Sequence, residues 1–179
     1  MPFTSIKCEF RTMRLVQIKQ LKIHKCTLPS VDRFHTRYPR LVKNFLTVAA
    51  ACLMNSENKV LLVRKRGTSK FMQPGGKLEP GESAHEAVVR EIEEELGISY
   101  ALSDLEPLGI WEGLAANEPD TGLRAHLFAG RLEHTPRPQA ELEEIIWVDP
   151  HEALQRKDLA PLLREHVLPQ AIERLTQAS

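Results

Sequence analysis

The sequence has only three cysteines, Cys8, Cys26 and Cys52, and no two of them form a C-x-x-C pair. An odd number of widely spaced cysteines argues against a disulfide framework and is typical of reduced, structural thiols. No apolar run approaches the roughly 18 residues that a membrane-spanning helix requires. The first residues are too polar and basic for the apolar core of a signal peptide. We therefore expect a cytoplasmic protein without a membrane segment.

Neither sign of charge dominates the whole chain, since 24 Lys and Arg are balanced by 24 Asp and Glu. The distribution is uneven, because residues 1–44 contain ten Lys or Arg against Glu9 and Asp32, a surplus of +8. This arm could bind nucleic acid, or it could be an extension that folds over the acidic remainder or stays mobile. Aromatic residues for base stacking are few there, so nucleic acid is the less favoured partner. A start codon further downstream is another alternative.

The remaining composition suits one globular domain, since 179 residues with 42% hydrophobic content can bury a core. We predict a basic extension at residues 1–43, of uncertain role, and an α/β domain at residues 44–179. The apolar run 45–54 and the segment 59–66, joined by turn-like residues 55–58, predict a β-hairpin. Further strands are expected at 105–113 and 123–132 and at Trp147 and Val148, and helices at 151–155 and 162–176.

The most informative segment is residues 76–98, GKLEPGESAHEAVVREIEEELGI. Ser83 and Glu86 have the spacing of a capping box, and Gly97 is a typical helix end, so a helix is expected between them. On that helix Glu91 and Glu95 lie one turn apart on a shared face, and Glu94 borders it. A buried stripe is expected from Ala84, Ala87, Val88, Ile92 and Leu96.

Carboxylates at this spacing repel one another, so the cluster needs a positive partner. A solvated acidic surface is the alternative interpretation, and it would be the usual one for a run of glutamates alone. The glycine-rich entry and the capped, amphipathic helix favour a metal site instead. Hard oxygen ligands indicate Mg²⁺ or Mn²⁺.

The segment resembles the Nudix box: glycine, five residues, glutamate, seven residues, then Arg-Glu-hydrophobic-any-Glu-Glu-any-Gly-hydrophobic. Every defined position is matched. The resemblance implies a Nudix-type α/β/α sandwich with a mixed β-sheet over about residues 44–179. It implies metal ligation by the acids Glu91, Glu94 and Glu95 and by a backbone carbonyl near the first box glycine, Gly76. It further implies that Arg90 orients the acids, with Glu82 as its partner.

The general base is open at this stage. In the family it is a box glutamate or an acid on a distant loop, and Glu141, Glu143 and Glu144 stand just before the strand expected to end at Val148. These acids could equally form a solvated loop. The prediction for the catalytic group is Arg90, Glu91, Glu94 and Glu144, with Glu141 as the alternative to Glu144. No Ser, His and Asp residues occur in a recognisable sequence context of a catalytic triad.

Substrate contacts are expected on the strand and loop that lead into the box. Arg64, Arg66, Phe71 and Gly75 are the predicted substrate-binding residues, and Lys65, Lys70, Met72 and Trp111 are further candidates. For the basic residues the alternative is an ordinary surface position. For the large apolar residues the alternative is the core, where such residues are usually found.

The function expected from this resemblance is a Mg²⁺-dependent pyrophosphohydrolase that cleaves a nucleoside diphosphate-linked small molecule, such as a nucleoside triphosphate. Two alternatives stay open. One is an RNA 5′-end or cap pyrophosphohydrolase that uses the basic arm. The other is a non-enzymatic Nudix-like ligand sensor, although a sensor would tend to lose box acids that are intact here. A homodimer is common in related proteins, but no residue requires it.

Overall fold

The computed structural model describes residues 44–115 and 118–177. The predicted basic extension at residues 1–43 lies outside the described residues, together with Cys8, Cys26 and the last two residues of the predicted domain. Within the described part, no helix is both long enough and apolar enough to cross a membrane.

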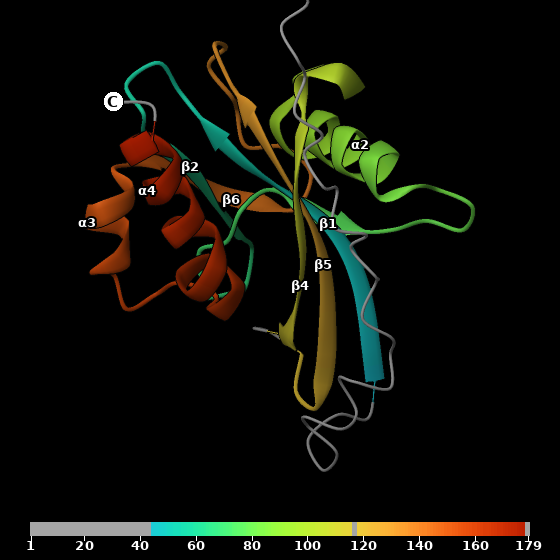
Figure 1. Ribbon diagram of the computed structural model, residues 1–179. Helices are drawn as coiled ribbons and strands as arrows, with labels where there is room; N and C mark the ends of the chain where they lie inside the picture. Colours follow the sequence, from blue (N-terminus) through green and yellow to red (C-terminus); the bar gives the residue numbers. More distant parts are fainter. Residues whose placement is uncertain (1–43, 116–117, 178–179) are drawn as a thin grey trace, which may run out of the picture.

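The centre of the fold is a mixed β-sheet (Figure 1). Its strands are β1 (Asn44–Met54), β2 (Val60–Lys65), β3 (Gly75–Lys77), β4 (Glu106–Leu114), β5 (Thr121–Arg131) and β6 (Leu142–Val148). The order is β4-β5-β1-β2-β6, and β3 pairs with β1 off this path. β1 and β5 are parallel, whereas the other pairs are antiparallel. The mixed sheet and the β1–β2 hairpin expected from the sequence are confirmed.

Helices cover both faces of the sheet, α2 on one and α3 with α4 on the other (Figure 1). The helical elements are α2 (Ala84–Leu96), a 3₁₀ turn (Leu102–Asp104), α3 (Pro150–Leu154), a π-helical segment (Leu163–Val167) and α4 (Leu168–Gln177). Successive buried residues of β1 alternate between two hydrophobic clusters, because neighbouring strand residues point to opposite faces. Ala49, Ala51 and Leu53 pack with α2, and Ala50, Cys52 and Met54 pack with the carboxyl-terminal helices. The α/β/α sandwich is confirmed.

The last predicted helix is interrupted, since residues 163–167 form a wider π-helical turn before α4. Pro169 explains the position of this turn. Proline has no N–H to donate, and its ring clashes with the carbonyl four residues earlier in a regular helix. A wider turn just before Pro169 relieves that clash.

The last strand begins earlier than expected, at Leu142, so the prediction that Glu143 and Glu144 precede it was wrong. The antiparallel pairing of β2 with β6 extends through Arg64 opposite Glu144 to Lys65 opposite Leu142. Opposite charges on paired strands stabilise a sheet, and this pairing places the two acids on β6.

Candidate active site

Helix α2 presents the box acids at fixed places because both of its ends are capped. The side chain of Ser83 accepts from the backbone N–H of Glu86, and the side chain of Glu86 accepts from the backbone N–H of Ser83, which is the expected capping box. Gly97 closes the helix with φ +68°, a left-handed conformation that favours glycine. Glu91 and Glu95 are buried residues of this helix.

Glu95 is the most buried acid of the site, with no exposed surface. Its Oε2 accepts the backbone N–H of Gly75 at 2.9 Å, and its Oε1 lies 3.0 Å from Nζ of Lys65. Burial raises the pKa of the Glu95 carboxyl to about 7, although Lys65 and the Gly75 N–H oppose this shift. The charge of Glu95 therefore depends on the cation beside it.

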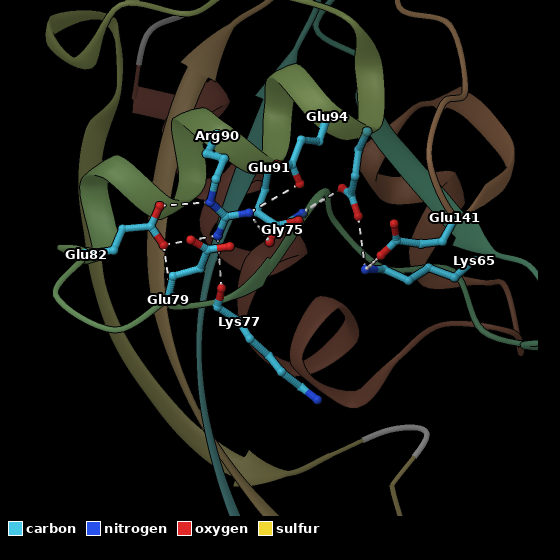
Figure 2. Close-up of polar contacts among 10 residues, drawn as sticks. Lys65, Gly75, Lys77, Glu79, Glu82, Arg90, Glu91, Glu94 and Glu141 are labelled. Carbon is cyan, nitrogen blue, oxygen red and sulfur yellow. Dashed lines mark hydrogen bonds and ion pairs between the residues drawn. The ribbon is translucent and has the colours of Figure 1, made fainter.

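Lys65 joins Glu95 to an acid outside the box. Its amine also donates to Oε1 of Glu141 at 2.6 Å, as Figure 2 shows. Burial opposes the charge on Lys65, but the two carboxylates outweigh it and raise the Lys65 pKa. The bond from Lys65 in turn lowers the pKa of Glu141, so Glu141 is a carboxylate at neutral pH.

Arg90 binds the other two acids of the box, and Figure 2 shows it between them and Glu82. Its Nε and Nη2 donate to the two carboxylate oxygens of Glu82 at 2.9 and 3.0 Å, a bidentate pair. Nη1 donates to Glu91 at 2.9 Å and to Glu94 at 3.3 Å, and Nη2 also reaches the carbonyl of Lys77 at 3.1 Å. The expected Arg90–Glu82 pair is present.

Two glycines bring the backbone of β3 against these acids. Gly75 has φ +145°, and a Cβ there would lie 2.2 Å from the carbonyl oxygen of Ala49. A Cβ on Gly76 would lie 2.2 Å from Oε1 of Glu91. Only glycine fits at either position, so both Gly75 and the box glycine Gly76 are required for the close approach of strand and acids.

A cavity of about 440 Å³ lies beside this network. Its lining has a charged part with Lys65, Lys77, Glu91, Glu118 and Glu141, together with the backbone at Gly75 and Gly76. The apolar part is made by Leu46, Val48, Ala50, Met72, Leu114, Ala115, Leu123, Ala160, Pro161 and Leu162, and Gln73 completes the lining. Clefts of this size and mixed character are typical of small-molecule sites.

Several residues predicted from the sequence are absent from the described lining. Phe71 is 4% exposed and belongs to the core, where Arg64 and Arg156 lie over its ring. Arg64 donates to Glu143 and Glu144, so its charge is already compensated. Arg66 is exposed and donates to the carbonyl of Ala140.

Of the acids considered as a general base outside the box, Glu141 lines the cavity, whereas Glu144 is paired with Arg64. From the sequence, Lys65 was only a further candidate for substrate contact, and Gln73 was not predicted. The sequence feature that pointed to Lys65 was its position next to Arg64 on one strand, because neighbouring strand residues direct their side chains to opposite faces. The sequence feature that pointed to Gln73 was its polar side chain, which follows two apolar residues and precedes a proline.

The donor set suits a divalent cation, because carboxylate and carbonyl oxygens are the ligands that Mg²⁺ and Mn²⁺ prefer. Glu95 supplies a completely buried carboxylate with a raised pKa, which a cation would stabilise in its charged form. Among the described residues, however, no three or more His, Cys, Asp or Glu side chains are gathered closely enough to hold a metal. Lys65 and Arg90 neutralise the acids instead, so a bound ion must share these oxygens with them.

Comparison with known proteins gives one consistent result. A family model for the NUDIX domain matches residues 44–170. Phosphatase NudJ of Escherichia coli (strain K12) is 33% identical over 127 residues, which cover 67% of this chain and 80% of NudJ. A Bacillus subtilis (strain 168) protein described as a "putative 8-oxo-dGTP diphosphatase" is 34% identical over 104 residues, 57% of this chain and 65% of that protein. This chain thus spans just under two thirds of the Bacillus relative.

Two solved structures have folds similar to that of this chain. The crystal structure of the MutT protein from Methanosarcina mazei Go1 has a TM-score of 0.60 at 25% identity, covering 74% of this chain and 96% of that one. The solution structure of the E. coli ORF135 protein has a TM-score of 0.57 at 28% identity, covering 75% and 93%.

Proposed function

This chain belongs to the Nudix family, and on that premise we propose that it is a metal-dependent pyrophosphohydrolase. The proposed substrate is a nucleoside triphosphate or another small molecule linked to a nucleoside diphosphate. The names of two relatives support this class, since one is called a phosphatase and the other a diphosphatase of the nucleotide 8-oxo-dGTP. A cytoplasmic location stays a prediction, and no residue requires a particular oligomeric state.

The observation that supports the proposal most strongly is the position of buried box acids beside a cavity. Glu91 lines the cavity, and Glu95 is bonded to Gly75 and Lys65, which line it too. Burying two carboxylates is costly unless cations neutralise them. Such acids next to an open cleft favour a function that uses their charge over a solvated surface.

Mg²⁺ or Mn²⁺ is the proposed cofactor, held by carboxylates of Glu91, Glu94 and Glu95 and by a backbone carbonyl of the Gly75–Gly76 segment. When bound, such an ion neutralises phosphate charge and makes bound water more acidic. Glu94 is the most exposed of the three acids, with 54% of its side chain accessible. Its carboxylate could therefore bind an ion that is also in contact with solvent.

The side chains of this protein prepare the site in two ways. Arg90 fixes Glu91 and Glu94 through one guanidinium that is anchored on Glu82. The amine of Lys65 lines the cavity, so it can donate to a phosphate oxygen while staying next to Glu95. Both cations therefore hold acids in place in the free protein, and Lys65 also offers charge to the substrate.

Hydrolysis also needs a group that takes a proton from the attacking water. Glu141 is the proposed acceptor, because it lines the cavity and the bond from Lys65 keeps it deprotonated. Glu144, which was predicted from the sequence, accepts a hydrogen bond from Arg64 instead. Exchange of Glu141 for Gln should therefore lower kcat, whereas exchange of Glu144 for Gln should not.

The decisive experiment is a panel of nucleoside triphosphates, sugar nucleotides and capped RNA, assayed with Mg²⁺, with Mn²⁺ and with EDTA. The expected result is metal-dependent release of a nucleoside monophosphate from at least one free nucleotide. Hydrolysis of capped RNA alone would favour the RNA-directed alternative. Binding of nucleotides without turnover under every metal condition would favour the sensor.

A further inference from the structure

Gln73 lines the cavity, and its buried amide oxygen lacks a hydrogen-bond partner among the described residues. The residue is only 5% exposed, and its Oε1 has no hydrogen-bond partner among the described residues. A buried polar atom without a partner is unfavourable, and such atoms in folded proteins are usually satisfied by a protein group, a water or a ligand. The Gln73 amide therefore requires an explanation that the fold itself does not provide.

The backbone on both sides of Gln73 is fixed by the sheet. Met72 exchanges backbone hydrogen bonds with Val63 at 2.8 and 2.9 Å, and the carbonyl of Pro74 accepts from the N–H of Ala51 at 3.0 Å. Because both neighbours are tied to strands, Gln73 cannot move into solvent without breaking these bonds. The residue is held beside the cavity by the same segment that positions Gly75 and Gly76.

The surroundings of Gln73 define what kind of group it can meet. Among the described lining residues, Gln73 is the one uncharged side chain with hydrogen-bonding atoms. The charged lining residues and the glycine backbone suit the phosphates, and the leucines, alanines and Val48 suit an apolar or aromatic body. A flat ring with polar atoms on one edge would use both the apolar lining and the amide.

We propose that Gln73 is the specificity-determining residue for the nucleobase, pairing through its amide with a base edge that carries a donor beside an acceptor. A glutamine amide has both functions side by side, and this is how glutamine binds the N6 and N7 edge of adenine in nucleic acid recognition. Rotation of the amide exchanges donor and acceptor, so the identity of the preferred base is an outcome of the test. This inference rests on the proposed function, since it assumes that a nucleotide enters the cavity.

The test compares the wild type with Gln73→Leu, which keeps a similar volume and removes the amide. In the wild type, kcat/KM for the four common nucleoside triphosphates should differ by at least about tenfold between the best and the poorest base. In Gln73→Leu, kcat/KM for the best base should fall roughly 10- to 100-fold, mostly through KM, and the preference should shrink to about threefold or less.

A base analogue separates recognition from a general loss of activity. For the preferred base, an analogue that lacks the edge group bonded by Gln73 should be a poor substrate for the wild type. The same analogue and its parent should be equal for Gln73→Leu. Gln177→Leu, which removes an exposed glutamine of α4 outside the described lining, should behave like the wild type in both assays.

Folding is checked by the melting temperature, which should be unchanged or higher in Gln73→Leu because a buried amide oxygen without a protein partner is removed. Binding of nucleoside monophosphates to metal-free protein, followed by the shift in melting temperature, gives a readout independent of turnover. Equal activity of the wild type toward all four bases, or an unchanged preference in Gln73→Leu, would overturn the role of Gln73 and leave the proposed function intact. Absence of hydrolysis of every nucleotide, with a base preference in binding that Gln73→Leu abolishes, would overturn the enzymatic function alone.

Discussion

Lys65 and Glu95 form an ion pair of 3.0 Å in which the carboxylate is completely buried and the lysine side chain is 24% exposed. The carboxylate also accepts one backbone hydrogen bond, from Gly75. A buried charge with a single cationic neighbour is sensitive to the loss of that neighbour. Without metal, the site therefore depends on Lys65 to neutralise Glu95. A bound divalent ion would interact with the same carboxylate.

Replacement of Lys65 by Met should destabilise the metal-free protein. Removing one partner of a buried pair costs about 3–5 kcal/mol, and protonation of Glu95 limits this loss at low pH. The pKa of Glu95 in the folded protein, about 7, lies above its usual value of 4.5, so its contribution to stability is full at low pH and is lost as the pH rises through 7. Urea unfolding with EDTA should therefore show a larger loss at pH 8 than at pH 5.

The control for that variant is Lys59→Met, because Lys59 forms an exposed pair with Glu57. Its free energy of unfolding should stay close to that of the wild type, because solvent screens an exposed ion pair. Added Mg²⁺ should restore more stability to Lys65→Met than to the wild type. Equal losses at both pH values, without rescue by Mg²⁺, would contradict the pairing of Lys65 with a charged Glu95.

Exchange of Glu95 for Gln should abolish metal-dependent turnover and leave the fold intact. The amide oxygen can still accept from Gly75, but the negative charge is gone. A loss of kcat of roughly 100-fold or more is expected, since a bound metal contributes several kcal/mol to catalysis. Glu93→Gln, on the same helix but exposed, should keep wild-type kcat; full activity of Glu95→Gln would refute its role as a ligand.

Arg90 should not be replaceable by Lys. A lysine keeps the charge but cannot bind both oxygens of Glu82 while also reaching Glu91 and Glu94. We expect kcat to fall roughly 10- to 100-fold, as for other groups that orient metal ligands, with unchanged helix content by circular dichroism. The matched control is Arg174→Lys, which alters the exposed bidentate pair with Glu106; a similar drop in both variants would show that the effect is not specific to Arg90.

Cys52 should be protected from thiol reagents in the folded protein. Burial raises the pKa of its thiol to about 11, opposed only by Arg174. In a background with Cys8→Ser and Cys26→Ser, modification at pH 8 should require unfolding. Because the folded pKa exceeds the usual thiol value of 9.0, stability is retained below pH 9 and lost as the pH rises toward 11. Cys52→Ala should show a smaller loss over this range, and rapid labelling of native protein would contradict the burial.

Deletion of residues 1–43 should leave turnover of free nucleotides within about twofold of the full chain, because the family model matches from residue 44 onward. Affinity for RNA is the contrasting readout. If the deletion lowers RNA affinity, and binding by the full chain weakens steeply with salt, the basic residues contact phosphates and the RNA-directed alternative gains.

The helix with its acids could be predicted from the sequence because its geometry is local. The capping residues Ser83 and Glu86, the closing Gly97 and the spacing of Glu91 and Glu95 all act within a few residues of one another. The hairpin of β1 and β2 was predictable for a similar reason, since two apolar runs flank a short turn-like segment. Pairing at this range leaves few alternatives for the chain.

The contacts between distant segments could not be predicted in this way. Glu141 and Glu144 are three residues apart, and the register of β6 against β2 directs one to Lys65 at the cavity and the other to Arg64. Phe71 is a large aromatic residue of the kind that could line a base or sugar pocket, but it lies in the core. Each outcome depends on a pairing between segments far apart in the chain.

The order of residues by itself determined the family, the sandwich and the helical edge on which the acids stand, because short-range spacing fixes helix ends and faces. Only the tertiary structure decided that Lys65 neutralises Glu95, that Glu141 lines the cavity and that the amide oxygen of Gln73 is buried without a partner in the described part of the chain. Burial and long-range register set these properties, and both arise when strands separated by dozens of residues pack into one sheet.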